Sequence, residues 1–138
     1  MGYPSKEPGQ VRLLLVHEHS EFFEQIKECA DMCRHECQVL CEFTQNRESA
    51  EQLIHDWEPT VVVLDMHIPG MSSYDVLAKC RANAIPVVAT SEFPSDEIEQ
   101  SAIKNGAGAY FPKPEDPETL EIFLKEAVQI AVPPFGRH

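Results

Sequence analysis

The sequence predicts a single α/β domain built from five strand–helix units around a parallel sheet. Short apolar runs alternate along the chain with longer segments of helical period, which is the pattern of consecutive βα units. The length of 138 residues suits one compact domain, and a hydrophobic fraction of 43% is enough to form its core. We therefore expect helices on both faces of the sheet.

The first two units occupy the N-terminal part of the chain. Residues 11–16 form an apolar strand, and Ser20 can cap the helix that follows. Residues 38–43 alternate apolar and polar side chains, which is typical of an edge strand with one face in water. The segment 47–57 is then a helix that ends before Pro59, because the residue preceding proline disfavours the helical region.

The central units surround the most apolar strand. Residues 60–64 contain three consecutive valines and are the best candidate for a strand buried on both faces. A turn at Pro69 and Gly70 precedes a helix over residues 73–82. Residues 86–90 then form the fourth strand.

The last part of the chain completes the sheet. Ser95 opens a fourth helix, which ends at Asn105. Residues 109–111 form a short fifth strand, and Asp116 caps a last helix that runs to about Ala131.

The charge of the chain excludes several functions. Lys and Arg total 11 against 23 Asp and Glu, so the net charge is −12, which disfavours direct binding to nucleic acid or to anionic membranes. Neither an apolar run of about twenty residues nor a signal-peptide pattern is present. We expect a cytoplasmic protein with a domain at residues 11–131 and tails at 1–10 and 132–138.

The cysteines form an unusual series. Cys29, Cys33, Cys37 and Cys41 recur every four residues, with Cys80 apart. Four thiols could ligate zinc or an iron–sulfur cluster, but the paired CxxC knuckles typical of such sites are missing. We interpret these residues as reduced cysteines that pack as small hydrophobes.

Polar side chains lie at the ends of four predicted strands. These residues are His17, Glu18 and His19 after the first strand, Asp65 and His67 after the third, Thr90 and Ser91 at the fourth, and Lys113 after the fifth. In an open parallel sheet, ligands bind beyond the carboxyl ends of the strands. Neighbouring carboxylates favour a divalent cation between them, and a lysine and a hydroxyl beside a carboxylate suit a phosphoryl group.

The order and spacing of these segments resemble the response regulator receiver domain of two-component signalling. The resemblance covers about residues 10–131 and is carried by LLLVHEHS, VVVLDMHIPGMSSYDVL, PVVATSE and GAGAYFPKPED. It implies a flavodoxin-like fold with a five-stranded parallel sheet in the order 2-1-3-4-5.

The resemblance also implies a role for several residues. Asp65 becomes the phosphoacceptor, which takes a phosphoryl group from a histidine kinase or a phosphotransfer protein. Lys113 would pair with the phosphoryl oxygens, and a cis peptide bond is expected before Pro114. Ser91 would be the switch hydroxyl and Tyr110 the switch aromatic, which together signal to a downstream protein or effector domain. A homodimer is compatible with the family, and no enzyme activity beyond slow autodephosphorylation is expected.

A divalent metal site follows from the same resemblance. Mg²⁺ would be held by Glu18, Asp65 and the backbone carbonyl of His67, but His17 stands where the family normally has an acid. Glu18, Asp65 and Lys113 then sum to about −1 instead of about −2, so Mg²⁺ binding should be weakened. The imidazole of His17 could instead favour Mn²⁺ or another transition metal.

Two functions remain open at this point. The first is a receiver that is phosphorylated on Asp65 and switches the surface of its fourth helix, fifth strand and fifth helix. The second is a phosphorylation-independent pseudo-receiver that acts as a protein-binding module, with or without a transition metal. Two departures from the family pattern would permit the second function: His17, and Glu92, where the family tends to have a small residue. The first function remains the leading hypothesis.

Overall fold

The structure is a computed structural model that describes residues 10–32 and 38–131. The five strands form one parallel sheet in the order β2-β1-β3-β4-β5. The elements in chain order are β1 (Gln10–Val16), α1 (Ser20–Met32), β2 (Gln38–Thr44), α2 (Arg47–Asp56), β3 (Val61–Asp65), α3 (Ser73–Ala82), β4 (Val87–Ser91), α4 (Asp96–Lys104), β5 (Ala109–Pro112) and α5 (Pro117–Ala131).

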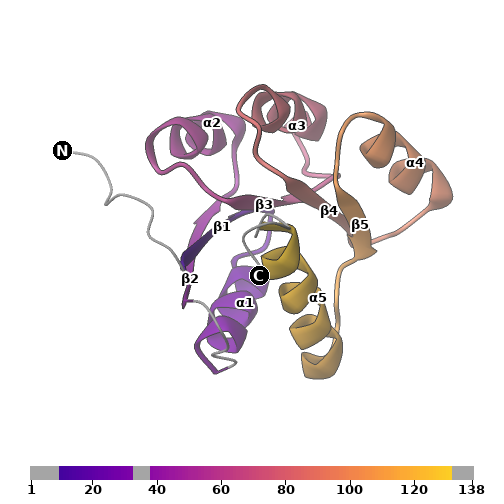
Figure 1. The fold of residues 1–138 in the computed structure, drawn as a ribbon. Coiled ribbons are helices and arrows are strands. Elements are labelled where there is room, and N and C mark those ends of the chain that lie inside the picture. Colours follow the sequence, from indigo (N-terminus) through magenta and orange to yellow (C-terminus); the bar gives the residue numbers. More distant parts are fainter. Residues whose placement is uncertain (1–9, 33–37, 132–138) are drawn as a thin grey trace.

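Helices cover both faces of the sheet (Figure 1). The helices α1 and α5 pack on one face, and α2, α3 and α4 pack on the other. Each face has its own apolar core, so β3, in the middle of the sheet, is buried along its whole length. The flavodoxin-like fold with strand order 2-1-3-4-5 is confirmed.

The alternation of side chains along β3 fixes the face on which its last residue lies. Val61 and Val63 belong to the core under α1 and α5, whereas Val62 and Leu64 belong to the core under α2, α3 and α4. Since successive side chains of a strand point to opposite faces, Asp65 lies on the α1/α5 face.

Strand ends are where the sequence predictions differ most from the structure. We expected β2, β3, β4 and β5 to end at residues 43, 64, 90 and 111, but each strand runs one residue further, to Thr44, Asp65, Ser91 and Pro112. The sheet hydrogen bonds continue there, because the N–H of Met66 donates to the carbonyl of Thr90 at 2.9 Å. All peptide bonds of the described residues are trans, so the expected cis peptide is wrong.

The described cysteines pack as hydrophobic residues. Cys29 and Cys41 are half-buried against the α1/α5 core, and Cys80 is buried in the other core. Burial raises the pKa of Cys41 to about 11 and that of Cys80 to about 12, which makes both thiols poor nucleophiles. Cys33 and Cys37 lie outside the described residues.

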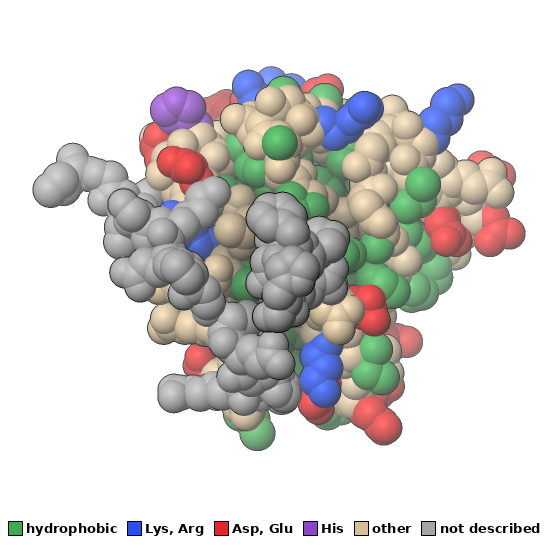
Figure 2. Space-filling view, in the orientation of Figure 1, with side chains coloured by type: hydrophobic (Ala, Val, Ile, Leu, Met, Phe, Trp, Pro, Cys, Tyr) green, Lys and Arg blue, Asp and Glu red, His purple; other side chains and the backbone are tan. Residues whose placement is uncertain are grey.

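The predicted tails fall largely outside the described ranges, except that Gln10 already belongs to β1. In those ranges, no helix is both long and apolar enough to cross a bilayer. Figure 2 shows that acidic side chains are spread around the visible face and are not gathered in one block.

Two helix caps offer a matched test of local stability. The side chain of Asn46 accepts the N–H of Ser49 at 2.8 Å at the start of α2, whereas Ser72, at the start of α3, makes no such bond. Asn46→Ala should lower the free energy of unfolding by about 1 kcal/mol, and Ser72→Ala by much less. Urea unfolding of the two variants measures the difference, and equal losses would contradict the capping role of Asn46.

Candidate functional site

Four neighbouring chain segments meet at the carboxyl edge of the sheet. Asp65 pairs with Thr90 across β3 and β4, and the N–H of Lys113 donates to the carbonyl of Ser91 at 2.9 Å. On the other side of β3, Val16 pairs with Leu64, so the next residue, His17, lies beside Asp65. The parallel register therefore brings the ends of β1, β3, β4 and β5 together.

The carboxylate of Asp65 is almost enclosed, since its side chain is 4% exposed. Its Oδ1 accepts the N–H of His67 at 3.0 Å, and its Oδ2 lies 3.6 Å from Nε2 of His17. The backbone carbonyl of Asp65 accepts the buried hydroxyl of Ser73 at 2.6 Å. The N–H of His67 thus holds the carboxylate, and the hydroxyl of Ser73 holds the backbone of the same residue.

The environment of Asp65 disfavours its ionised form. Burial raises the pKa of Asp65 to about 6, and the carboxylates of Glu18 and Glu92 act in the same direction, while the N–H of His67 opposes them. At pH 7 the group is still mainly ionised and is therefore in its nucleophilic form.

His17 is neutral and has a defined tautomer. Its side chain is 1% exposed, and its ring centroid lies 4.9 Å from that of Phe22. Burial lowers the pKa of His17 to about 4, and Lys113 and His19 add to this effect. Because Nδ1 accepts the N–H of His19 at 3.1 Å, the hydrogen-bond network assigns the proton of the neutral ring to Nε2. The contact with Asp65 is thus not an ion pair.

Three partly exposed side chains connect the two loops beside this carboxylate. Nε2 of His19 lies 3.7 Å from a carboxylate oxygen of Glu18 and 3.7 Å from one of Glu92. Gln45 holds the first loop from the side, because its amide donates to the carbonyl of Glu18 at 2.8 Å. The bridge links the loop after β1 to the loop after β4.

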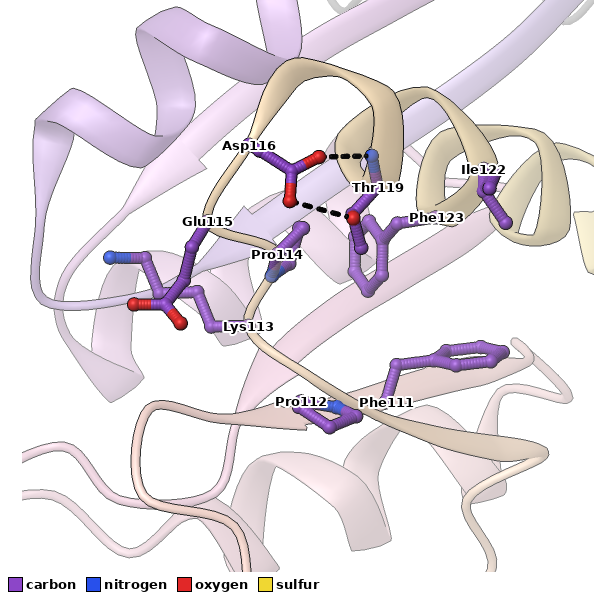
Figure 3. A pocket seen from close by; sticks show the side chains of 9 residues that line it. All are labelled: Phe111, Pro112, Lys113, Pro114, Glu115, Asp116, Thr119, Ile122 and Phe123. Atoms are coloured by element: carbon purple, nitrogen blue, oxygen red, sulfur yellow. Dashed lines mark hydrogen bonds between the residues drawn. The ribbon is translucent and has the colours of Figure 1, made fainter.

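Lys113 lies on the same side of the sheet edge as His17. Figure 3 shows that the Lys113 side chain extends away from the α5 residues that line the neighbouring pocket. Its Nζ lies 5.6 Å from the ring centroid of Phe22, the ring that also contacts His17. The positive charge is therefore close to His17, whose pKa it lowers.

The predicted switch residues share the opposite face of the sheet. By alternation along β4, Ser91 lies on the same face as Ala89, in the core against which Tyr110 packs. The Tyr110 hydroxyl is buried and has no hydrogen-bond partner among the described residues. Thr90 instead lies on the face of Asp65, and its buried hydroxyl likewise lacks a partner in the described part of the chain.

Sequence analysis assigned no role to Ser73 or to the His19 bridge. The hydroxyl of Ser73 reaches Asp65 only because the turn after β3 folds α3 back onto the strand end. His19 meets Glu92 across 73 positions of sequence, and nothing in the sequence around His19 indicates such a partner.

Comparison with known proteins identifies the family. Residues 13–125 match the family model of the response regulator receiver domain. The chain belongs to this family, as the sequence resemblance predicted.

Among curated proteins, the chain is 28% identical over 125 residues to the nitrate/nitrite response regulator protein NarL of Escherichia coli (strain K12). The match covers 89% of this chain and 56% of that protein, so the chain spans about half the length of this relative.

Solved receiver structures share the fold. The orphan response regulator HP1043 of H. pylori superimposes with a TM-score of 0.74 at 18% identity, covering 91% of this chain and 99% of that one. The DNA-binding response regulator of the LuxR family from Staphylococcus aureus gives a TM-score of 0.72 at 23% identity, covering 88% and 98%.

Receiver domains typically bind Mg²⁺ at the phosphorylation site, but the residues of this edge do not fit that ion. Mg²⁺ requires oxygen ligands, whereas His17 directs an N–H toward Oδ2 of Asp65. No three His, Cys, Asp or Glu side chains of the described residues are placed to hold a metal ion. The expected ligation by Glu18, Asp65 and the carbonyl of His67, or by His17 to Mn²⁺ or another metal, therefore gains no support here.

Asp65→Asn should stabilise the protein in a pH-dependent way. The pKa of Asp65 is about 6 in the folded chain against an ordinary value of 3.8. The contribution of this group to the free energy of unfolding is therefore fully present below pH 3.8 and is lost as the pH rises to about 6, because the folded chain disfavours the ionised carboxylate. Removing the charge should raise the free energy of unfolding by up to about 3 kcal/mol at pH 7.5 and by little below pH 3.5. Urea unfolding of both proteins at several pH values measures this difference.

The pH dependence of the wild-type free energy of unfolding is less informative by itself, because the lowered pKa of His17 changes the stability in the opposite direction. Its lowered pKa makes stability rise between about pH 4 and 6.5, which offsets the Asp65 contribution. The control is Asp31→Asn, which removes an exposed carboxylate on α1. A gain at Asp65→Asn that does not vary with pH would contradict the prediction.

Proposed function

We propose that this chain is the receiver of a two-component system, in which Asp65 accepts a phosphoryl group from a histidine kinase or phosphotransfer protein. Receiver domains are in general signalling switches and not enzymes. The observation that carries the proposal is the buried carboxylate of Asp65, which lies beside the ends of β1, β4 and β5 at the carboxyl edge of a receiver-family sheet. The proposed domain spans residues 11–131 and acts in the cytoplasm.

The chemistry follows from the groups around the carboxylate. An oxygen of Asp65 forms the new bond to phosphorus while the bond between phosphorus and the donor breaks, and the donor group leaves with the electron pair. The N–H of His67 holds Oδ1 in position. The ammonium group of Lys113 pairs with the oxygens of the transferred group. Mg²⁺ binds this pocket more weakly than it binds a pocket with two acids at the end of β1.

The signal then leaves through the other face of the sheet. In this proposal Ser91, whose side chain lies on the face of the sheet opposite to Asp65, turns around the end of β4 toward the phosphoryl group and so makes room for Tyr110, which packs against the core under α4. Ile103 on α4 and Ile122 on α5 are exposed, and Figure 2 shows hydrophobic side chains over the α4 and β5 side of the molecule. This surface would meet a downstream protein, an effector domain or a second copy of the chain, and the charge of −12 makes direct nucleic-acid contact unfavourable.

One observation favours a second function, the pseudo-receiver that binds partners without phosphorylation. The Asp65 side chain is 4% exposed, and the bridge of His19 with Glu18 and Glu92 lies across the neighbouring loops. A phosphoryl donor can reach Asp65 only after these side chains move.

Chemical phosphorylation distinguishes the two functions. Incubation with acetyl phosphate and Mg²⁺ should add the mass of one phosphoryl group to the intact protein, because Asp65 is an ionised nucleophile at neutral pH. Asp65→Asn should abolish the gain, and Asp31→Asn, which alters an exposed carboxylate, should leave it unchanged. A gain that survives Asp65→Asn would show that another residue is the acceptor. The absence of any gain, together with no response to beryllofluoride, would favour the pseudo-receiver.

A further inference from the structure

The Asp65 pocket contains a buried hydrogen-bond donor that has no acceptor. Nε2 of His17 is fully shielded from solvent and has no hydrogen-bond partner within the described ranges. Buried polar groups in folded proteins are nearly always paired, so an unpaired one calls for a physical explanation. The nearest charged oxygen, Oδ2 of Asp65, is 3.6 Å away, which is too long for a hydrogen bond.

The imidazole is held so that this donor keeps its direction. The N–H of His19 donates to Nδ1, which leaves the proton on Nε2, and the ring packs against Phe22. The ring cannot turn without breaking the hydrogen bond to Nδ1. Nε2–H therefore remains directed at the Oδ2 side of the Asp65 carboxylate, to which no backbone N–H of the described residues donates.

The same arrangement is unsuited to a hard cation. A metal ion bound to Oδ2 would meet a proton on Nε2 where the family normally offers a carboxylate oxygen. Lys113 adds a positive charge on the same side of the edge. The site therefore offers donors to an anion, and although the carboxylates of Glu18 and Glu92 act on Asp65, no three ligating side chains of the described residues are placed around one cation.

We propose that the Nε2–H of His17 replaces the divalent cation, by donating a hydrogen bond to an oxygen of the phosphoryl group carried by Asp65, so that this receiver is phosphorylated without a metal ion. The inference rests on the proposed function. With acetyl phosphate as donor, the carboxylate of Asp65 forms the bond to phosphorus, the bond from phosphorus to the acetyl oxygen breaks, and acetate leaves with the electron pair. No proton is transferred in this step. The new phosphoryl oxygens are satisfied by His17, Lys113 and backbone N–H groups.

Metal dependence of phosphorylation tests the proposal. The full chain is incubated with acetyl phosphate, or with beryllofluoride, in millimolar Mg²⁺ or in EDTA, and modification is followed by intact mass and by NMR. The rates in Mg²⁺ and EDTA should agree within about twofold for the wild type. His17→Asp, which restores an acid at this position, should depend on Mg²⁺ by about tenfold or more.

Two further variants separate the donor from the shape of the side chain. His17→Gln keeps an N–H near the position of Nε2 and should retain metal-independent modification, whereas His17→Phe fills the space without a donor and should lose it. His55→Gln changes an exposed histidine on α2 and should behave as the wild type does. Because the comparison of Mg²⁺ with EDTA is made on the wild type, the test does not depend on the folding of any variant.

Each outcome has a separate meaning. Equal modification in Mg²⁺ and EDTA supports the role of His17. Modification of Asp65 only when Mg²⁺ is present overturns that role and leaves the proposed receiver function intact. No modification by either reagent under either condition overturns both.

Discussion

The approach of His17 to Asp65 is the contact on which the proposed chemistry of this chain depends. It exists because β1 and β3 are paired in parallel register, so that the residue after Val16 lies beside the residue after Leu64. Both side chains are buried on the α1/α5 face, and burial acts on them in opposite directions, raising the pKa of the carboxylic acid and lowering that of the imidazole. The pair is consequently a neutral donor facing an anion.

This arrangement changes the balance of charge around the Asp65 carboxylate. A pocket with several carboxylates needs a cation to relieve their repulsion. Here His17 removes one negative charge and places a hydrogen-bond donor at the same point, while Lys113 provides the remaining positive charge nearby. The same arrangement restricts the access of a phosphoryl donor to Asp65, because the Asp65 side chain is nearly buried and the His19 bridge spans the neighbouring loops. If Asp65 is the phosphoacceptor, as proposed, the phosphoryl donor reaches it only after these loops move.

The fold was predictable because its signals are local. The valines of β3, the proline after α2 and the Asp116 cap of α5 each indicate an element by side-chain chemistry alone. The predicted ends of β2, β3, β4 and β5 were each one residue short, since strand ends depend on hydrogen bonds to a neighbouring strand. The enclosure of Asp65, the bond from Ser73 and the bridge of His19 to Glu92 join residues distant in sequence, and no local pattern encodes them.

The protonation of His17 is the most direct test of this account. Nitrogen-15 NMR of the imidazole ring distinguishes the two neutral tautomers from each other and from the imidazolium form. The structure predicts that at neutral pH Nε2 of His17 carries the only ring proton and Nδ1 carries none. A proton on Nδ1, in either the other tautomer or the charged ring, would contradict the account, because His19 could then no longer hold the donor of His17 toward Asp65.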